Sequence, residues 1–293
     1  MNFWYKIFYG FCWVIALLPL RCLYLLSDIL FILVYYVVRY RRKVVLENLR
    51  NSFPEKTEKE RRKIARKFYR FLCDLFIETF KTLNISMSQM QRRIRYSNPE
   101  IFNDLYRKAK QIFIVTGHYG NWEWMASLAH ATSYDLAALY QPLESKLFDK
   151  LVYHLRTKFG AKAVPLYATI KEIIRYHQEK RLTILGFASD QAPHRNASHY
   201  WTTFLNQDTS IYLGIEKLAK QFNTAVVYYE VRRVKRGYYE VDVTLITENA
   251  AETADMEITN KHVQLLEETI RRNPQYWLWS HRRWKHKREI VRL

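Results

Sequence analysis

Cysteine and glycine are both scarce in this chain of 293 residues. The three cysteines, Cys12, Cys22 and Cys73, have neither the spacing of a disulfide framework nor that of a metal site. We therefore expect no disulfide, no bound metal and no other cofactor. Because there are only seven glycines, one that falls at a sharp turn is informative, since glycine is the usual residue where the backbone bends tightly or approaches a ligand closely.

Acidic residues are few relative to basic ones. The 47 lysines and arginines exceed the 28 aspartates and glutamates, which gives a net charge of +19. Such an excess favours a polyanionic partner: nucleic acid, an anionic membrane face or a phosphorylated substrate. The sequence has no zinc-finger spacing and no RNP-type aromatic motif, so we predict no nucleic-acid partner. Anionic membrane lipid is the better match, because basic residues follow an apolar N-terminus.

The N-terminal residues 7–38 are almost continuously apolar, and only Arg21 and Asp28 among them are charged. Pro19 and Arg21 divide the stretch into two runs, each shorter than the roughly 20 apolar residues of a spanning helix. Three interpretations follow: one tilted or kinked span, a hydrophobic helix pair lying in one leaflet, or a buried helix pair of a soluble domain. No small-residue cleavage site follows the first run, which argues against a signal peptide.

A basic cluster follows this apolar stretch directly, and it consists of Arg39, Arg41, Arg42 and Lys43. By the positive-inside rule it places the remaining chain in the cytoplasm. We therefore predict a membrane anchor at residues 1–43 and one domain at residues 44–293, on the cytoplasmic face of an inner membrane. The oligomeric state is left open by the sequence.

The next segment begins with a capping box, Thr57-Glu58-Lys59-Glu60, which predicts a helix N-terminus. One face of the predicted helix is apolar. The other face is basic and includes Arg61, Arg62, Lys63, Arg66, Lys67 and Arg70. This basic face is interpreted either as a solvated surface or as a surface that lies on anionic headgroups, and the two are compatible.

From Gln111 onward, strand-like and helical patterns alternate, which predicts an α/β sheet with helices on its faces. The predicted strands are residues 112–116, 135–140, 162–166, 182–187 and 224–234. The predicted helices lie near residues 121–131, 144–158, 169–179, 209–222 and 258–272. Residues 226–234 and 238–246 flank Lys235-Arg236-Gly237 and predict a hairpin, so the sheet is expected to be mixed.

The most informative motif follows the first of these strands, where residues 116–123 read TGHYGNWE. Two glycines flank His118, and Glu123 stands five positions after it. Open α/β sheets place their chemistry just past strand ends. An imidazole titrates near neutral pH, and a carboxylate on its far nitrogen would fix its tautomer and raise its basicity. The motif therefore predicts a base with an orienting partner; the alternative is an ordinary turn whose histidine only forms hydrogen bonds.

This motif, H-x-x-x-x-E within G-H-x-G-N-W-E, resembles the catalytic signature of the lipid A biosynthesis acyltransferases, the late acyltransferases of lipopolysaccharide assembly. The resemblance continues in order through Leu155-Arg156, Phe159-Gly160, Val164-Pro165 and Ser189-Asp190-Gln191, and it ends at residues 276–285, YWLWSHRRWK. One segment departs from the pattern: an F-x-G-x-P-A-like stretch is replaced by FLNQDTS at residues 204–210. We expect that loop to contact substrate.

The resemblance implies a glycerolipid acyltransferase-like fold and a set of roles. His118 would be the base and Glu123 its partner, so that the acceptor hydroxyl attacks without an acyl-enzyme. Ser127 and Ser189 are the nearest serines, but neither lies in a G-x-S-x-G elbow, which argues against a serine hydrolase. The expected substrate-binding residues are Asn121, Arg156, Asp190, Gln191, Arg282 and Arg283, among which Asp190 and Gln191 could instead hold the site together. His281 is expected to pack or to form hydrogen bonds, and His194 and His199 lack metal-ligand spacing.

The reaction that the resemblance implies is transfer of a long acyl chain to a hydroxyl of a lipid A precursor. The expected donor is acyl carrier protein, and acyl-CoA is the alternative. A first rival hypothesis is a related acyltransferase that uses another acceptor, such as a glycerophospholipid or an amino-acid lipid. A second is a basic, membrane-bound lipid or nucleic-acid binding protein with a degenerate site, and the intact His118 and Glu123 pair argues against it.

Overall fold

The computed structural model describes residues 3–193 and 200–288. Its centre is a seven-stranded sheet with the strand order β1-β9-β8-β2-β5-β3-β4. All neighbouring strands in it are parallel except β8 and β9, which form an antiparallel hairpin. The strands are β1 (Ile94–Tyr96), β2 (Ile112–Thr116), β3 (Asp135–Tyr140), β4 (Lys162–Pro165), β5 (Thr183–Ala188), β8 (Ala225–Lys235) and β9 (Tyr238–Thr247). The predicted mixed, mostly parallel α/β sheet is confirmed.

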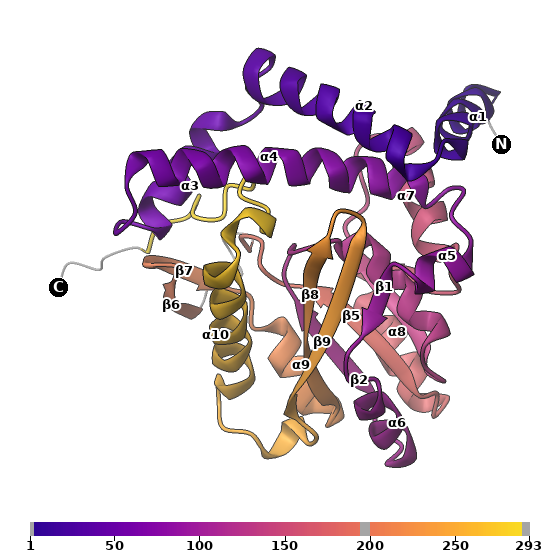
Figure 1. Ribbon diagram of the computed structural model, residues 1–293. Coiled ribbons are helices and arrows are strands. Elements are labelled where there is room, and N and C mark those ends of the chain that lie inside the picture. Colours follow the sequence, from indigo (N-terminus) through magenta and orange to yellow (C-terminus); the bar gives the residue numbers. More distant parts are fainter. Residues whose placement is uncertain (1–2, 194–199, 289–293) are drawn as a thin grey trace.

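Helices cover both faces of the sheet (Figure 1). They are α5 (Met87–Gln91), α6 (Glu100–Arg107), α7 (Lys146–Thr157), α8 (Thr169–Gln178), α9 (Gly214–Phe222) and α10 (Glu257–Arg272). Side chains of β2 alternate between two hydrophobic clusters: Phe113 and Val115 pack with α8, α9 and α10, whereas Ile112 and Ile114 pack with α5 and α6. Every residue of β2 is buried, as expected for a central strand covered on both sides.

The longest helix, α4 (Glu58–Lys81), lies across the end of the sheet where the β8–β9 hairpin turns (Figure 1). The predicted capping box is present at its start, because the Thr57 hydroxyl accepts from the Glu60 amide while the Glu60 carboxylate accepts from the Thr57 amide. The helix contributes Phe68 to one hydrophobic cluster and Phe71 to the other. It therefore closes the same end of the sheet at which β2 leads into the histidine motif.

Two apolar helices, α1 (Phe3–Leu17) and α2 (Leu20–Ile32), form the N-terminus. A single π-helical turn extends α2 to Val37, and a short helix, α3 (Arg42–Ser52), follows. The segment Leu20–Val37 is long and apolar enough to cross a membrane, and 28% of it is buried within the protein. It packs along α4 (Figure 1), so α2 buries one side against the domain.

One local prediction was wrong, and a second predicted helix is present as a 3-10 helix. The helix predicted near 209–222 begins only at Gly214, because Thr209–Ile211 belong to a second hairpin, formed by β6 (Tyr200–Phe204) and β7 (Gln207–Ile211). Leu205 and Asn206 turn that hairpin with positive φ at both positions, a conformation that a scan for glycine does not reveal. The segment predicted as helical near 121–131 is the 3-10 helix η2 (Trp122–His130).

Candidate active site

The histidine motif forms a tight turn between β2 and η2. Gly120 has φ +62°, and a Cβ atom there would lie 2.2 Å from the carbonyl oxygen of Val231. No other residue type fits that position without moving the backbone. The turn carries His118 past the end of β2, next to the end of β5, where Ser189 donates its amide to the Thr116 carbonyl.

The partner of His118 is Asp190, which follows β5. The Nδ1 atom of His118 lies 2.6 Å from Oδ1 of Asp190, and the His118 amide donates to Oδ2 at 2.8 Å. The Asp190 side chain is 3% exposed and that of His118 is 19% exposed. With its Nδ1–H committed to Asp190, His118 presents Nε2 as an acceptor on the open side, 3.3 Å from the side-chain Nε2 of Gln191.

Burial and charge act in opposite directions on this pair. Burial by itself lowers the pKa of His118, but the negative charge and hydrogen bonds of Asp190, together with the charge of Glu123, raise it above its ordinary value. Burial favours neutral Asp190, yet attraction to His118 and the donors around the carboxylate hold the pKa of Asp190 well below its usual range. The pair therefore consists of an ionised carboxylate and an imidazole of increased basicity.

The C-terminal tryptophan-rich segment completes this arrangement. The indole N–H of Trp277 donates to Oδ2 of Asp190 at 2.7 Å. The same segment pairs with the motif through its backbone, because Leu278 donates to the His118 carbonyl and Gly120 donates to the Tyr276 carbonyl. Residues 276–279 thus support the His118 turn and the Asp190 carboxylate from the C-terminal side of the chain.

Glu123 does not make the expected contact with His118. Its carboxylate instead receives a forked pair of hydrogen bonds from Arg156, at 3.1 Å from Nε and 2.9 Å from Nη2, and a third from Trp122 Nε1. Burial would raise the pKa of Glu123, but the Arg156 charge outweighs burial and lowers it. The orienting role predicted for Glu123 is thereby corrected: Asp190 occupies the Nδ1 side of the imidazole, and Glu123 holds Arg156 nearby.

Comparisons with known proteins show the family of the chain. The family model described as bacterial lipid A biosynthesis acyltransferase matches residues 2–286. The chain belongs to this family. It is 24% identical over 283 residues to the lipid A biosynthesis lauroyltransferase of Escherichia coli K12, covering 96% of this chain and 91% of that protein. It is 22% identical over 245 residues to a lipid A biosynthesis acyltransferase of Haemophilus influenzae, covering 83% and 75% of the two chains.

Three residues predicted to bind substrate have internal partners in this acyltransferase. Asn121 is fully buried, donates to Glu78 at 2.7 Å and accepts from the Trp124 amide at 3.2 Å. Asp190 serves His118, as described above. Arg283 is 3% exposed and donates to the Ser210 carbonyl. These contacts give Asn121, Asp190 and Arg283 structural roles, and substrate contact at the three positions stays a prediction.

The other predicted substrate-binding residues remain accessible. Gln191 and Arg282 are exposed, and the Arg156 side chain is 22% exposed beside Glu123. His281 accepts a hydrogen bond from the Ala192 amide, and burial lowers its pKa to about 4. This confirms that His281 forms a hydrogen bond. His194 and His199 lie outside the described residues, and within 3–193 and 200–288 no cluster of His, Cys, Asp and Glu could hold a metal ion.

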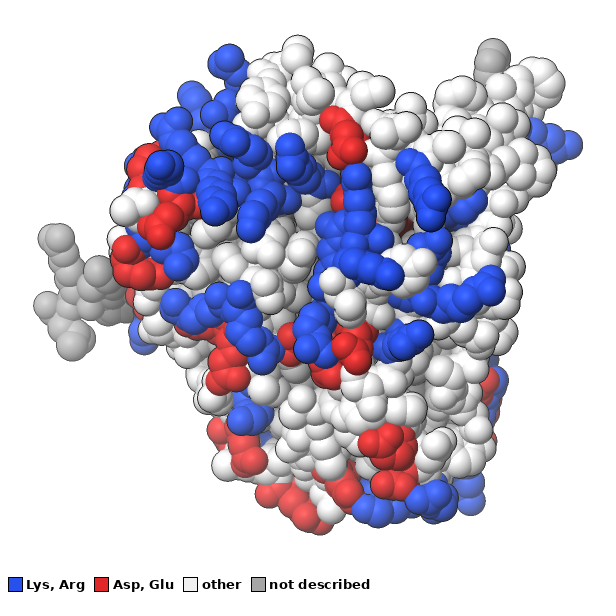
Figure 2. All heavy atoms as spheres, viewed as in Figure 1, with Lys and Arg blue, Asp and Glu red and all other residues white. Residues whose placement is uncertain are grey.

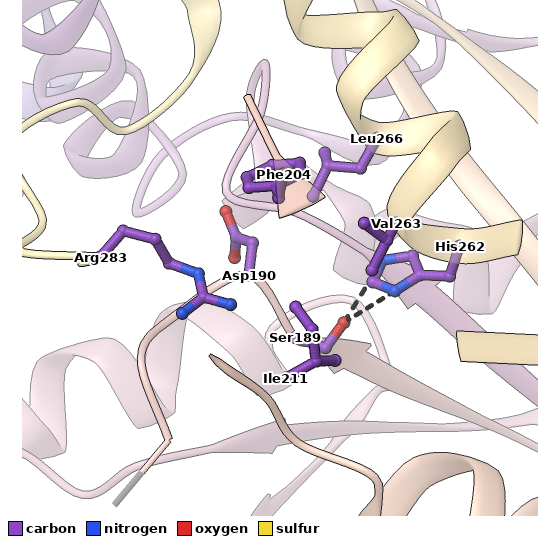
Figure 3. Close-up of a pocket in the computed structure, with 8 residues that line it drawn as sticks. All are labelled: Ser189, Asp190, Phe204, Ile211, His262, Val263, Leu266 and Arg283. Carbon is purple, nitrogen blue, oxygen red and sulfur yellow. Dashed lines mark hydrogen bonds between the residues drawn. The ribbon is translucent and has the colours of Figure 1, made fainter. Parts of the chain in front are cut away.

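The segment 204–210, expected to contact substrate, forms the end of the β6–β7 hairpin, with Asn206 and Asp208 exposed and Phe204 and Leu205 buried. Phe204 contacts the rings of Trp277 and Trp284, and Leu205 is fully buried. Phe204 also lines a small cavity behind the site (Figure 3), together with Ser189, Asp190, Ile211, His262, Val263, Leu266 and Arg283. The segment that departs from the family pattern therefore packs beside Asp190 and Trp277, which support His118.

Proposed function

We propose that this family member transfers a long acyl chain from an acyl thioester, carried by acyl carrier protein, to a hydroxyl of a lipid A precursor. The observation that carries the proposal is the His118–Asp190 pair, in which Nδ1 is held by a buried carboxylate and Nε2 faces the open side of the site. A base with that tautomer can accept a hydroxyl proton. The names of the two relatives, a lipid A biosynthesis lauroyltransferase and a lipid A biosynthesis acyltransferase, support the acceptor.

The proposed chemistry is direct attack. The acceptor hydroxyl gives its proton to Nε2 of His118 while its oxygen bonds to the thioester carbonyl carbon. Asp190 stabilises the imidazolium that forms. Collapse of the tetrahedral intermediate breaks the carbon–sulfur bond, and the imidazolium returns the proton to the leaving thiolate. No acyl-enzyme is needed.

We propose that Arg156 stabilises negative charge during this reaction. Its guanidinium is held in one orientation by the two hydrogen bonds to Glu123. A partly exposed, always protonated fork of donors suits the developing oxyanion or a phosphate of either substrate. Glu123 is then a positioning residue that acts through Arg156.

We further propose that the protein acts at the cytoplasmic face of an inner membrane. The surface of α1, α2 and the π-helical turn displays exposed apolar side chains, among them Phe11, Val14, Leu25, Ile29 and Val37. Lysines and arginines gather beside it over α3 and α4 (Figure 2), where Lys43, Arg62, Lys63, Arg66, Lys67 and Arg70 are exposed. Apolar insertion flanked by basic residues suits an anionic leaflet.

The test is acyl transfer by purified membranes, with long-chain acyl carrier protein as donor and a tetra-acylated lipid A precursor as acceptor. Lipid mass should show one added acyl chain with the wild-type protein and none with His118→Ala. Acyl-CoA in a parallel reaction distinguishes the donors. Transfer only to a glycerophospholipid would overturn the proposed acceptor, and equal activity of wild type and His118→Ala would overturn the mechanism.

A further inference from the structure

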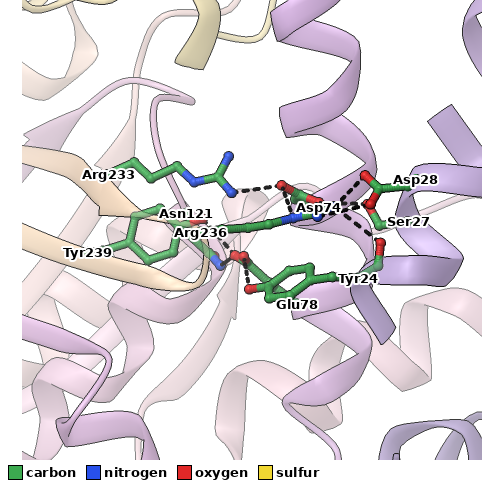
Figure 4. Close-up of polar contacts among 9 residues, drawn as sticks. All are labelled: Tyr24, Ser27, Asp28, Asp74, Glu78, Asn121, Arg233, Arg236 and Tyr239. Atoms are coloured by element: carbon green, nitrogen blue, oxygen red, sulfur yellow. Dashed lines mark hydrogen bonds and ion pairs between the residues drawn. The ribbon is translucent and has the colours of Figure 1, made fainter. Parts of the chain in front are cut away.

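A second buried carboxylate, Glu78 on α4, connects the catalytic turn to the apolar N-terminal helix. Its side chain is fully buried and accepts three hydrogen bonds of 2.7 Å, from Tyr24 of α2, Asn121 of the catalytic turn and Tyr239 of β9. Figure 4 shows these side chains converging on the carboxylate from three separate elements. Every donor comes from a segment distant in sequence, so Glu78 connects α2, the catalytic turn and β9 to α4.

The contacts of Glu78 surround the segment that carries Glu123. Asn121 donates to its carboxylate, and Trp124 donates its indole N–H to the Glu78 carbonyl at 3.3 Å. Asn121 in turn caps η2 by accepting the Trp124 amide. Trp122 and Glu123 lie between these two anchored residues, so the direction in which Glu123 points toward Arg156 depends on Glu78.

A neighbouring ion-pair network fixes α2 to the same helix. Asp74, one turn before Glu78, accepts from Ser27 at 2.7 Å and from Arg233 and Arg236 at 2.7 and 2.6 Å. Arg236 also pairs with Asp28 at 2.8 Å (Figure 4). Tyr24, Ser27 and Asp28 of α2 therefore face α4 and the β8–β9 hairpin, next to the buried Leu20 and Leu23, which cluster with Ile77 of α4, whereas Leu25 and Ile29 are exposed.

We propose that Glu78 is a positioning residue for acyl transfer: it holds the catalytic turn through Asn121 and simultaneously ties that turn to the docked helix α2 through Tyr24. A buried carboxylate is a costly way to fill a core, because apolar side chains of similar volume stabilise equally well or better. Its advantage is directional, since one acceptor group specifies the places of three donors. The N-terminal helix is accordingly part of the active-site framework as well as an apolar surface.

The substitutions that test this are Glu78→Gln and Glu78→Met. Glutamine retains an oxygen for Asn121 and Tyr239, and the Tyr24 hydroxyl can turn to accept from its amide, so near wild-type activity is expected. Methionine keeps the volume but leaves Asn121 without an acceptor. We expect Glu78→Met to lower kcat by about tenfold or more with little change in KM, because reacting groups lose alignment. The matched control is Glu216→Met on α9, which removes another buried carboxylate that accepts from Met256 and Thr259, away from the catalytic turn.

A second measurement does not depend on the substrate. Backbone hydrogen exchange in the full-length protein in detergent should become faster at residues 117–130 and in α2 for Glu78→Met, and in α2 alone for Tyr24→Phe. Glu78→Gln and Glu216→Met should leave residues 117–130 protected. Unchanged exchange at residues 117–130 in Glu78→Met, or equal loss of kcat in Glu78→Met and Glu216→Met, would overturn the proposal. The kinetic part rests on the proposed function, which fails separately if the wild-type protein transfers no acyl chain.

Discussion

Trp277 and Asp190 are joined by a buried hydrogen bond of 2.7 Å, from the indole nitrogen to Oδ2 of the carboxylate that orients His118. The two residues are 87 positions apart. The C-terminal segment thus reaches back across the sheet to the residue that sets the tautomer of the base. Trp277 holds the carboxylate of Asp190 in one orientation. Oδ2 accepts from the Trp277 indole and from the backbone amide of His118, and Oδ1 faces the His118 imidazole.

The first prediction concerns Asp190→Asn. The amide oxygen is expected at the Oδ2 position, where two N–H donors point, which places the amide NH₂ against Nδ1 of His118. The imidazole would then carry its proton on Nε2 and could not act as a base, so kcat should fall by about 10⁴-fold. Steady-state acyl transfer checks this, and a loss of less than about tenfold would contradict the orienting role of Asp190.

A second prediction follows from the raised pKa of His118. The base must be unprotonated, so kcat/KM should decline as the pH falls through a value above the ordinary 6.5 of histidine. Residual activity of Asp190→Asn should decline only at lower pH, because the charge that raises the pKa of His118 is gone. The pH profiles of the two proteins provide the measurement, and an acid limb that stays at the same pH in Asp190→Asn would contradict the prediction.

Glu123→Gln and Arg156→Lys should impair the enzyme through one shared defect. Either change breaks the forked contact and releases the cation from its orientation. We expect each to lower kcat about 10²-fold, as loss of a transition-state donor does, and the double variant to be little worse than either one. Arg181→Lys, in the exposed pair with Asp135, is the control and should retain full activity. Additive losses would show that Glu123 and Arg156 act independently.

Trp277→Phe removes the indole N–H and keeps an aromatic ring. Loss of this donor to a buried carboxylate should destabilise the protein by about 1–3 kcal/mol and also lower activity. Trp284→Phe is the matched control, since Trp284 donates to Thr209 and does not contact Asp190. Denaturant unfolding and acyl transfer, measured together, should therefore show a loss of activity for Trp277→Phe alone.

Gly120→Ala should be among the most destabilising single-methyl substitutions in the protein. The positive φ disfavours alanine, and its Cβ would collide with the Val231 carbonyl. We expect a loss of about 2–4 kcal/mol in the free energy of unfolding. Gly186→Ala, whose Cβ would meet its nearest neighbour at an ordinary 4.0 Å, should change it by less than about 1 kcal/mol. Equal thermal midpoints for the two variants would contradict this account of the turn.

Features that depend on neighbouring residues could be predicted from the sequence. The capping box at Thr57, the hairpin around Gly237 and the buried strand before His118 each follow from local patterns, and each is present. The β6–β7 hairpin was missed because its turn uses Leu205 and Asn206, which carry no strong turn signal. Its strands gain stability from packing on Trp277 and Trp284, a contact that local patterns do not contain.

The reaction class follows from short motifs along the chain, because their order resembles that of an acyltransferase family and His118 stands at a strand end. Which carboxylate serves that histidine depends on the packing of the folded chain. Glu123 is close to His118 in sequence, but after the turn at Gly120 its carboxylate pairs with Arg156. Asp190 lies next to His118 because β2 pairs with β5. Proximity along a chain is fixed by bonds, and proximity of side chains depends on which strands pair and on which donors compete for each carboxylate.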